Sequence, residues 1–246
     1  MNPAIDHPNR YSPQTQVGVV AYLIGSENPC PGTPTVTDYD GNVYNTIRIG
    51  DQCWMKQNLN SVRNAGGNSI SRYCYANSNT NCELYGGLYQ WATVMNGSGT
   101  SSTIPSGVQG ICPTGWHVPS DGEWTQLTNY LISTYVDINS GNVGNKLKSC
   151  RQISSPLGGE CATSDHPRWT NHATQFGTND FGFTALPGGY IYNGTSYEIG
   201  NHTMFWTTTN NTSTTAWYRE LVHDAGTVSR HYWPKQDYMG LRCLKN

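Results

Sequence analysis

The chain has 246 residues, of which 36% are hydrophobic and only 12% are charged, and its formal net charge at pH 7 is −2. Aromatic residues make up 11% of the chain. This combination excludes a disordered protein, because disorder requires high net charge and few aromatic side chains. The sequence also contains no cluster of Lys and Arg, so we expect no nucleic-acid partner.

Residues 1–33 are rich in proline and are predicted to be an N-terminal extension ahead of one domain, residues 34–246. The longest apolar run of the chain, residues 17–25 (VGVVAYLIG), lies in this extension. A helix that crosses a bilayer needs about 20 apolar residues, so we expect no membrane span. Polar residues precede the run and no clean cleavage site follows it, so we interpret it as a strand rather than a signal peptide.

The chain contains eight cysteines. None of them has C-x-x-C spacing, and no Cys/His cluster has the spacing of metal ligands, so no metal site is predicted. We expect all eight to form disulfides, although the sequence does not choose among the possible pairings. Disulfides persist in oxidising compartments, which predicts an extracellular, cell-surface or virion-surface protein; the alternative is a cytosolic protein with buried free thiols. Most of the cysteines are close in sequence, as Cys30 and Cys53, Cys74 and Cys82, and Cys150 and Cys161, with Cys112 and Cys243 remaining.

The first predicted element of the domain is a β-hairpin over residues 35–54. Apolar and polar side chains alternate on both sides of Asp40-Gly41, a turn dipeptide whose glycine tolerates a positive φ. A helix with one buried stripe is predicted next, over residues 83–95, where four apolar residues recur at helical spacing ahead of the stop signal Asn96-Gly97. These four residues are Leu84, Leu88, Trp91 and Met95.

A second helix is predicted to begin after Ser120. Ser120 and Glu123 have the spacing of a capping box, in which each side chain bonds the backbone of the other. Residues 112–119 are predicted to be extended, with Trp116 and Val118 pointing into the core. The helix itself is predicted to bury one face, formed by Trp124, Leu127 and Leu131.

The rest of the chain is predicted to be a loop-rich region followed by strands. Residues 140–180 are the loop-rich region, in which Cys150 and Cys161 are expected to close an excursion. Strands are predicted at 181–190, 204–208, 216–223, 227–233 and 239–244. The order of elements predicts an α+β fold with mixed or antiparallel sheets, two helices and long loops.

Several segments, in this order, closely resemble the FISUMP, or major paralogous, domain family. They are residues 36–59, 85–96, 111–127, 181–190, 205–208, 216–221 and 240–246. The resemblance implies a disulfide-stabilised C-type-lectin-like fold in which the chain ends meet. Some members of this family are variable proteins of diversity-generating retroelements, in which error-prone reverse transcription rewrites adenines of a C-terminal repeat. The resemblance therefore implies a variable C-terminal binding face.

The residues of the C-terminal β-region, about 204–240, also suggest a binding face. Trp217 and Leu221 alternate with Tyr218, Glu220 and Val222, so one side of this strand can pack while the other meets solvent. Aromatic and short polar side chains are typical of binding surfaces. The predicted ligand-binding residues are Tyr218, Glu220, His223, Asp224, Ser229, His231, Tyr232, Trp233, Gln236, Asp237 and Tyr238, with Thr207, Thr209, Asn210 and Asn211 as a second group.

Catalysis and calcium binding are weaker interpretations. The sequence has no G-x-S-x-G and no H-E-x-x-H motif, and each cysteine has a structural partner available, so we predict no enzyme. It also lacks the Glu-Pro-Asn and Gln-Pro-Asp tripeptides of sugar-binding C-type lectins. The segment at residues 178–180 could supply calcium ligands, but Asn-Asp ahead of a strand is more typical of a turn. We therefore expect no cofactor.

The sequence thus predicts a non-enzymatic surface protein that binds a protein or glycan ligand on another cell or virus surface. The alternative is a structural cell-envelope or adhesion module without a diversified site, in which the C-terminal strands form only an aromatic-rich final sheet.

Overall fold

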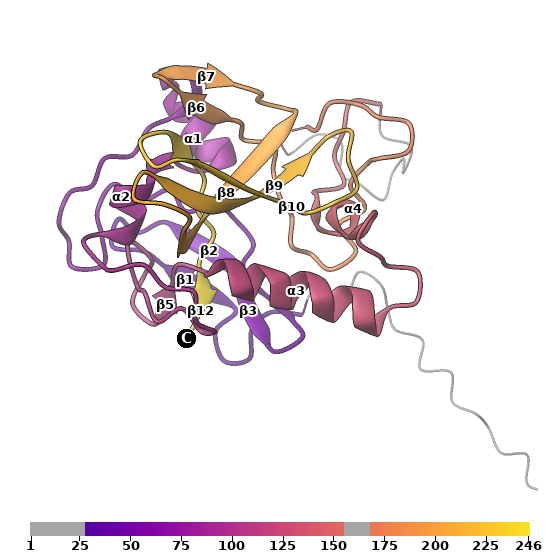
Figure 1. Cartoon of the computed structure of the whole chain (residues 1–246), viewed down its shortest axis with the longest axis horizontal. Helices are drawn as coiled ribbons and strands as arrows, with labels where there is room; N and C mark the ends of the chain where they lie inside the picture. The colour runs from indigo at the N-terminus through magenta and orange to yellow at the C-terminus, as the bar shows by residue number, and fades with distance from the viewer. Residues whose placement is uncertain (1–27, 155–167) are drawn as a thin grey trace, which may run out of the picture.

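The computed structural model describes residues 28–154 and 168–246. These residues form mostly β-sheets, accompanied by four α-helices. Figure 1 shows the sheet β8–β10 between helix α3 (Asp121–Thr134) and the hairpin β6–β7, in agreement with the contacts of α3 and β6 with β8. Within the described part of the chain, no helix combines the length and apolar character that a membrane crossing requires.

The first sheet joins the beginning and the end of the domain. The C-terminal strand β12 lies between β3 and β5, and Lys245 Nζ donates to Thr33 Oγ1 at 2.7 Å. The predicted hairpin around Asp40-Gly41 is confirmed, with Gly41 at φ +88° between two antiparallel strands. In sheet order the strands are β1 (Thr35–Thr37), β2 (Val43–Ile49), β3 (Gln52–Met55), β12 (Leu244–Lys245) and β5 (Trp116–His117).

The helix predicted over residues 83–95 is wrong. After a 3₁₀ turn η1 (Tyr75–Asn77), helix α1 covers Asn79–Tyr85, a short strand β4 covers Tyr89–Gln90, and α2 covers only Trp91–Met95. The break lies at Gly86, whose φ is +86° and whose missing Cβ would lie 2.5 Å from the Cβ of Asn58. Only glycine fits this close approach. The predicted stop at Asn96 is confirmed, because Asn96 is the left-handed C-cap of α2.

The second helix prediction is confirmed in α3. Ser120 Oγ accepts from the Glu123 amide at 3.2 Å, and Glu123 Oε2 accepts from the Ser120 amide at 2.8 Å, which completes the capping box. The predicted face of Trp124, Leu127 and Leu131 is buried. A further short helix, α4 (Val143–Leu147), lies in the region that was predicted to be loops.

Two more sheets form the C-terminal half. One has the order β10-β9-β8 and the other has the order β4-β11-β6-β7. The strands predicted at 204–208, 216–223 and 227–233 are present. The strand predicted at 239–244 is wrong, because residues 241–243 are irregular and separate two short strands, and residues 181–189 are irregular as well, so that only Tyr190 begins a strand. The bounds are β6 (Tyr190–Tyr192), β7 (Thr195–Tyr197), β8 (His202–Asn210), β9 (Thr215–Val222), β10 (Ser229–Pro234) and β11 (Tyr238–Met239).

Strands β8 and β9 of the three-stranded sheet contribute to both hydrophobic core clusters. Successive side chains of a strand point to opposite faces, so β8 places Phe205 in one cluster and Trp206 in the other. Phe205 stacks on Trp124 of α3 with 5.3 Å between ring centroids, while Trp206 Nε1 donates to Tyr89 O of β4 at 2.9 Å. Packing on both sides therefore fixes β8 and β9, and β10 pairs with the free edge of β9.

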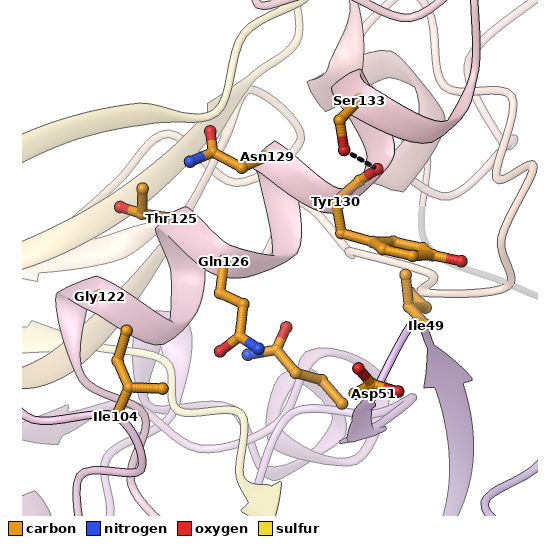
Figure 2. A pocket seen from close by; sticks show the side chains of 10 residues that line it. Ile49, Asp51, Ile104, Gly122, Thr125, Gln126, Asn129, Tyr130 and Ser133 are labelled. Atoms are coloured by element: carbon orange, nitrogen blue, oxygen red, sulfur yellow. Dashed lines mark hydrogen bonds between the residues drawn. The ribbon is translucent and has the colours of Figure 1, made fainter.

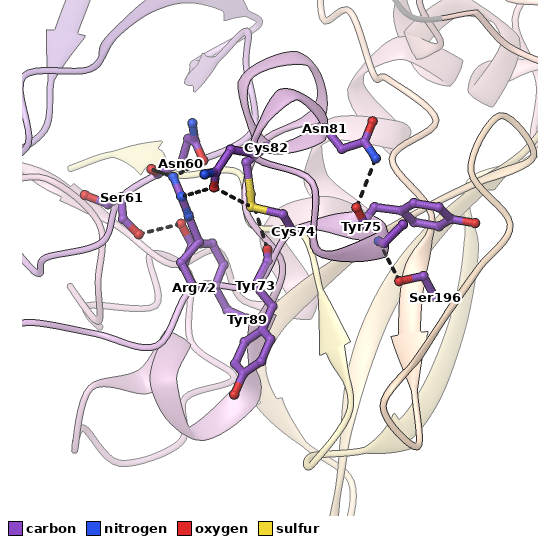
Figure 3. The surroundings of a disulfide bond; sticks show 12 residues. Asn60, Ser61, Arg72, Tyr73, Cys74, Tyr75, Asn81, Cys82, Tyr89 and Ser196 are labelled. Carbon is purple, nitrogen blue, oxygen red and sulfur yellow. Dashed lines mark hydrogen bonds between the residues drawn. A yellow bond between two sulfur atoms is a disulfide. The ribbon is translucent and has the colours of Figure 1, made fainter.

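Three disulfides join described residues. They link Cys30 with Cys53, Cys74 with Cys82, and Cys112 with Cys243. Cys150 is also disulfide-bonded, whereas Cys161 lies outside the described residues. Figure 3 shows the Cys74–Cys82 bridge beside η1, where the Ala76 amide donates to Ser196 Oγ of β7 at 2.8 Å. This disulfide therefore lies next to the hydrogen bond that joins η1 to the hairpin β6–β7.

Candidate binding surface

Strand β10 forms an edge of the three-stranded sheet. Its three central residues, Arg230, His231 and Tyr232, are exposed and the others are half-buried, unlike those of β8, which are mostly buried. An open depression of about 580 Å³ runs along β9 and β10. Its lining residues are Trp217, Tyr218, Glu220, Arg230, His231, Tyr232 and Trp233.

The register of β9 and β10 assigns these residues to two faces. His231 is opposite Tyr218, and Tyr232 is opposite Trp217; directly opposite residues share a face of the sheet. We call one side the Glu220 face, and its side chains are Tyr218, Glu220, Ser229, His231 and Trp233. We call the other side the α3 face, and its side chains are Trp217, Arg219, Arg230 and Tyr232.

The hairpin β6–β7 extends the Glu220 face. The Trp233 ring lies 6.2 Å from that of Tyr190 and 5.7 Å from that of Tyr192, measured between centroids. Tyr190 also stacks on Tyr197 at 5.8 Å. We call the whole cluster the aromatic patch; its members are Tyr190, Tyr192, Tyr197, Tyr218, His231 and Trp233.

A buried carboxylate lies beside the aromatic patch. Glu220 is 7% exposed, and its Oε1 lies 2.7 Å from His202 Nδ1, while its Oε2 lies 3.8 Å from His231 Nε2. Burial acts to lower the pKa of His202, but the hydrogen bond and the charge of Glu220, together with Glu198, raise it above the ordinary value. Burial also raises the pKa of Tyr190, and these two carboxylates raise it further. The local potential is therefore negative.

The pair of His202 and Glu220 makes stability depend on pH. Because the pKa of His202 is raised in the folded state, the pair contributes its full stabilisation below the unfolded value of about 6.5 and loses it as pH rises through the folded pKa. We expect the difference in unfolding free energy between the wild type and His202→Gln to shrink from pH 5.5 to pH 8.5 in urea titrations. In a Glu220→Gln background, the difference in unfolding free energy caused by His202→Gln should no longer change with pH. A difference that stays constant with pH in both backgrounds would contradict the role of the His202–Glu220 pair.

The α3 face is ordered by a carboxylate of α3. Asp121 Oδ1 accepts from Arg219 Nε at 2.8 Å, and its Oδ2 accepts from Arg230 Nε at 2.7 Å. The Arg230 guanidinium lies 3.4 Å from the ring centroid of Trp217, whose edge meets Tyr232 at 5.4 Å. Trp217, which the sequence suggested as scaffold, therefore supports the exposed side chains of β10.

The predicted binding residues fall into three classes of exposure. Asn210, Asn211, Asp224, His231, Tyr232 and Gln236 are exposed. Thr209, His223, Ser229, Trp233 and Tyr238 are half-buried. Thr207, Tyr218, Glu220 and Asp237 are buried, although Tyr218 and Glu220 still line the depression.

Two predicted contact residues do not reach the surface. Thr207 is 0% exposed and donates its hydroxyl to Trp217 O at 2.8 Å. Asp237 is 2% exposed and accepts from the Asn193 amide at 3.2 Å, which fastens the β6–β7 turn to the β10–β11 turn. Both side chains support the surface from the interior: Thr207 lies in the buried part of β8, and Asp237 lies in the turn that precedes β11.

The remaining predicted residues are not all brought together. Tyr238 pairs with Ile191, so its side chain faces away from Tyr190 and Tyr192, and its ring lies 4.4 Å from that of Tyr73. Asn210 and Asn211 lie at the β8–β9 turn, whereas residues 223–224 lie at the opposite end of β9. The surface centred on β10 is therefore smaller than the predicted set.

Four residues of this surface were missed by the sequence reasoning. Tyr190, Tyr192 and Tyr197 flank Asn193-Gly194, which is a strong hairpin signal between alternating residues. That signal was present and would have identified the hairpin. His202 carried no local signal, because its role depends on Glu220 across the strand pair.

A second depression, of about 480 Å³, lies beside α3 and contains no residue of the C-terminal sheet. Figure 2 shows Gln126 and Tyr130 projecting from α3 toward the region of Ile49 and Asp51. Part of this wall is already engaged, since Gln52 Nε2 donates to Glu123 O at 2.9 Å. The lining is a mixture of amide, hydroxyl and apolar groups.

The segment considered for calcium uses its oxygens within the fold. Asn179 Oδ1 accepts from the Thr184 amide at 2.7 Å, and Asp180 Oδ2 forms an ion pair with Lys146 Nζ at 2.7 Å. Asn179 has φ +52°, as in the turn that the sequence favoured. Over residues 28–154 and 168–246, no group of three or more His, Cys, Asp or Glu is placed to hold a metal ion.

Comparison with known proteins identifies the family of the chain. The family model described as the Fibrobacter succinogenes major domain matches residues 47–245, which run from β2 to β12 and include the whole candidate surface. No curated protein and no solved structure matches the chain. The match confirms the family resemblance noted in the sequence, and the chain belongs to the Fibrobacter succinogenes major domain family.

Proposed function

We propose that this chain is a non-enzymatic ligand-binding protein of the cell or virion surface, and that its C-terminal β-region binds a protein or glycan on another cell or virus. The observation that carries the proposal is the concentration of aromatic and polar side chains along β10, an edge strand that borders an open depression. Rigid aromatic rings offer contact area at low entropy cost, and short polar groups adapt to the partner.

The rigid support of this surface favours binding. Asp121 fixes the α3 face through two arginines, and Asp237 fixes hairpin β6–β7 under the Glu220 face. A preorganised surface loses less conformational entropy when it binds. The disulfides support an extracellular location, because such bonds persist in oxidising compartments.

The finer parts of the proposal are a C-type-lectin-like fold and diversification by a retroelement. The position of β12 beside the first strands supports the fold, since the ends of the domain meet there. Exposed Asn210, Asn211, His231 and Tyr232 support diversification, because His and Tyr are reachable from Asn codons by changing adenines. A retroelement would leave an imperfect downstream repeat of the codons for about residues 204–240, differing at adenines, next to a reverse transcriptase.

A matched pair of tyrosines tests the binding face. Tyr232 and Tyr39 are both 55% exposed, but only Tyr232 borders the depression. We expect Tyr232→Ala to weaken capture of a ligand from a glycan array or a panel of purified bacterial and phage surface proteins by at least about tenfold, since truncating a central tyrosine often costs about 2 kcal/mol or more.

Tyr39→Ala is the control, and both variants should melt within about 3 °C of the wild type because both rings are exposed. Equal binding by the wild type, Tyr232→Ala and His231→Ala to the same ligand would remove β10 from the binding face. In that case the surface would be that of a structural cell-envelope or adhesion module.

A further inference from the structure

We propose that the aromatic patch and Glu220 form a subsite for an organic ammonium group, that is, a protonated or methylated amine. This inference rests on the proposed function and names the chemistry that the Glu220 face recognises. The subsite combines aromatic rings with a carboxylate that is only partly paired, and Glu220 lines the same depression as Tyr218, His231 and Trp233 of the aromatic patch.

Aromatic rings from three strands meet at this subsite, where Trp233 packs nearly perpendicular to both Tyr218 and Tyr190. Trp233 comes from β10, Tyr218 from β9, and Tyr190 from β6, and the Trp233 centroid is 6.3 Å from that of Tyr218 and 6.2 Å from that of Tyr190. Tyr192 and Tyr197 remain 38% and 40% exposed at the rim. Tryptophan and tyrosine faces attract cations through the ring quadrupole, and clusters of them are the usual receptors for quaternary ammonium groups.

Glu220 has one oxygen free for a ligand. Oε1 is engaged by His202 at 2.7 Å, whereas Oε2 makes no hydrogen bond within the described residues and lies 3.8 Å from His231 Nε2. The residue is 7% exposed and lines the depression. A carboxylate in this low-dielectric position attracts a cation more strongly than one in bulk water.

A second buried carboxylate lies beside the same ring. Asp237 is 2% exposed, and its Oδ2 has no hydrogen-bond partner among residues 28–154 and 168–246. Its Oδ1 accepts from Asn193, at the turn that follows Tyr192. Burial raises the pKa of Asp237, although the Asn193 amide and the neighbouring Trp233 indole act to lower it. A positive charge bound against Trp233 would compensate this unpaired acceptor.

The arrangement favours an organic cation over a hydrated metal ion. Calcium requires six to eight oxygen ligands, whereas this subsite offers ring faces and one accessible carboxylate oxygen. Ring faces suit cations that are weakly hydrated and carry methyl or methylene groups. The volume of the depression, about 580 Å³, lies within the range of small-ligand sites.

Affinity for the cation should increase with pH. The groups that face Glu220 are His202 on β8, His231 on β10 and Tyr190 on β6, with Glu198, Asp224 and Asp237 acting from the adjoining turns. Protonated His202 competes with the ligand for the charge of Glu220, and this competition ends when His202 loses its proton. Binding should therefore be weaker at pH 5.5 than at pH 8.

The test uses choline as the probe and 3,3-dimethylbutanol, its uncharged isostere, as the matched ligand. In calorimetric titrations of the full chain at pH 8, with the Trp233 indole followed by NMR, we expect millimolar binding of choline and at least tenfold weaker binding of the alcohol. Trp233→Ala should weaken choline binding at least tenfold, Trp233→Phe less, and Glu220→Gln at least fivefold. Tyr39→Ala, which removes an equally exposed ring outside the depression, should leave it unchanged.

Two further probes distinguish the source of the ammonium group. Phosphocholine represents a lipid or glycan headgroup, and Nα-acetyl-Nε-trimethyllysine methylamide represents a protein side chain. The probe that binds with the higher affinity identifies the source. Equal binding of choline and the alcohol, or loss of choline binding in Tyr39→Ala but not in Glu220→Gln, would overturn the inference. Capture of a surface ligand that persists when choline fails to bind would overturn this subsite alone and leave the proposed function standing.

Discussion

Replacing Cys112 and Cys243 together with alanine is expected to lower the free energy of unfolding by about 5 kcal/mol. The disulfide joins residues 131 positions apart, and closing so long a loop removes much of the entropy of the unfolded chain. Both residues are 0% exposed, and both belong to the core cluster that also holds Trp206 and Tyr218. Urea titrations with linear extrapolation measure the effect.

The Cys74–Cys82 disulfide provides the internal control. It joins residues only 8 positions apart, so Cys74→Ala with Cys82→Ala should cost about 2.5 kcal/mol by the same argument. If the two double variants were equally destabilised, loop closure would not be the source of the stabilisation. The long bridge would then act only through local packing at β12.

Local rules predicted those parts of the fold that depend on neighbouring residues. The hairpin at Asp40-Gly41 and the capping box at Ser120 each follow from side chains within four positions of each other. The helix predicted over residues 83–95 failed for the opposite reason. Its break at Gly86 is imposed by Asn58, which approaches from another part of the chain, and periodicity alone contains no such information.

The candidate surface was predictable along each strand but not across strands. Alternation placed Tyr218 and Glu220 on the face opposite Trp217 and Leu221, as the pairing of β9 with β10 has it. It did not show that Tyr218 and Glu220 are themselves buried. It could not show that both faces of β8 are covered, so Thr207 was placed at the surface although it is buried. The aromatic patch depends on hairpin β6–β7 reaching β10, a contact that only the folded chain reveals.

The second large effect is expected at Arg219, which fastens β9 to the first turn of α3. Its Nη2 donates to Asp121 O at 2.9 Å and to Thr125 Oγ1 at 2.6 Å, in addition to the ion pair with Asp121. Only 6% of its side chain is exposed. Removing one partner of a buried pair leaves a charge without compensation, so Arg219→Met should lower the free energy of unfolding by about 3 to 5 kcal/mol.

Arg230 binds the same carboxylate from the surface and provides the matched control. Its side chain is 44% exposed, so solvent screens the pair and Arg230→Met should cost about 1 kcal/mol or less. Amide hydrogen exchange should show the same asymmetry, with protection lost along β9 and β10 only in Arg219→Met, because the Arg219 side chain is buried and bonds Asp121 and Thr125 of α3, whereas Arg230 is largely exposed. Equal losses in the two variants would mean that solvent and Arg230 satisfy Asp121, and that the hydrophobic core alone fixes the strand that presents the binding face.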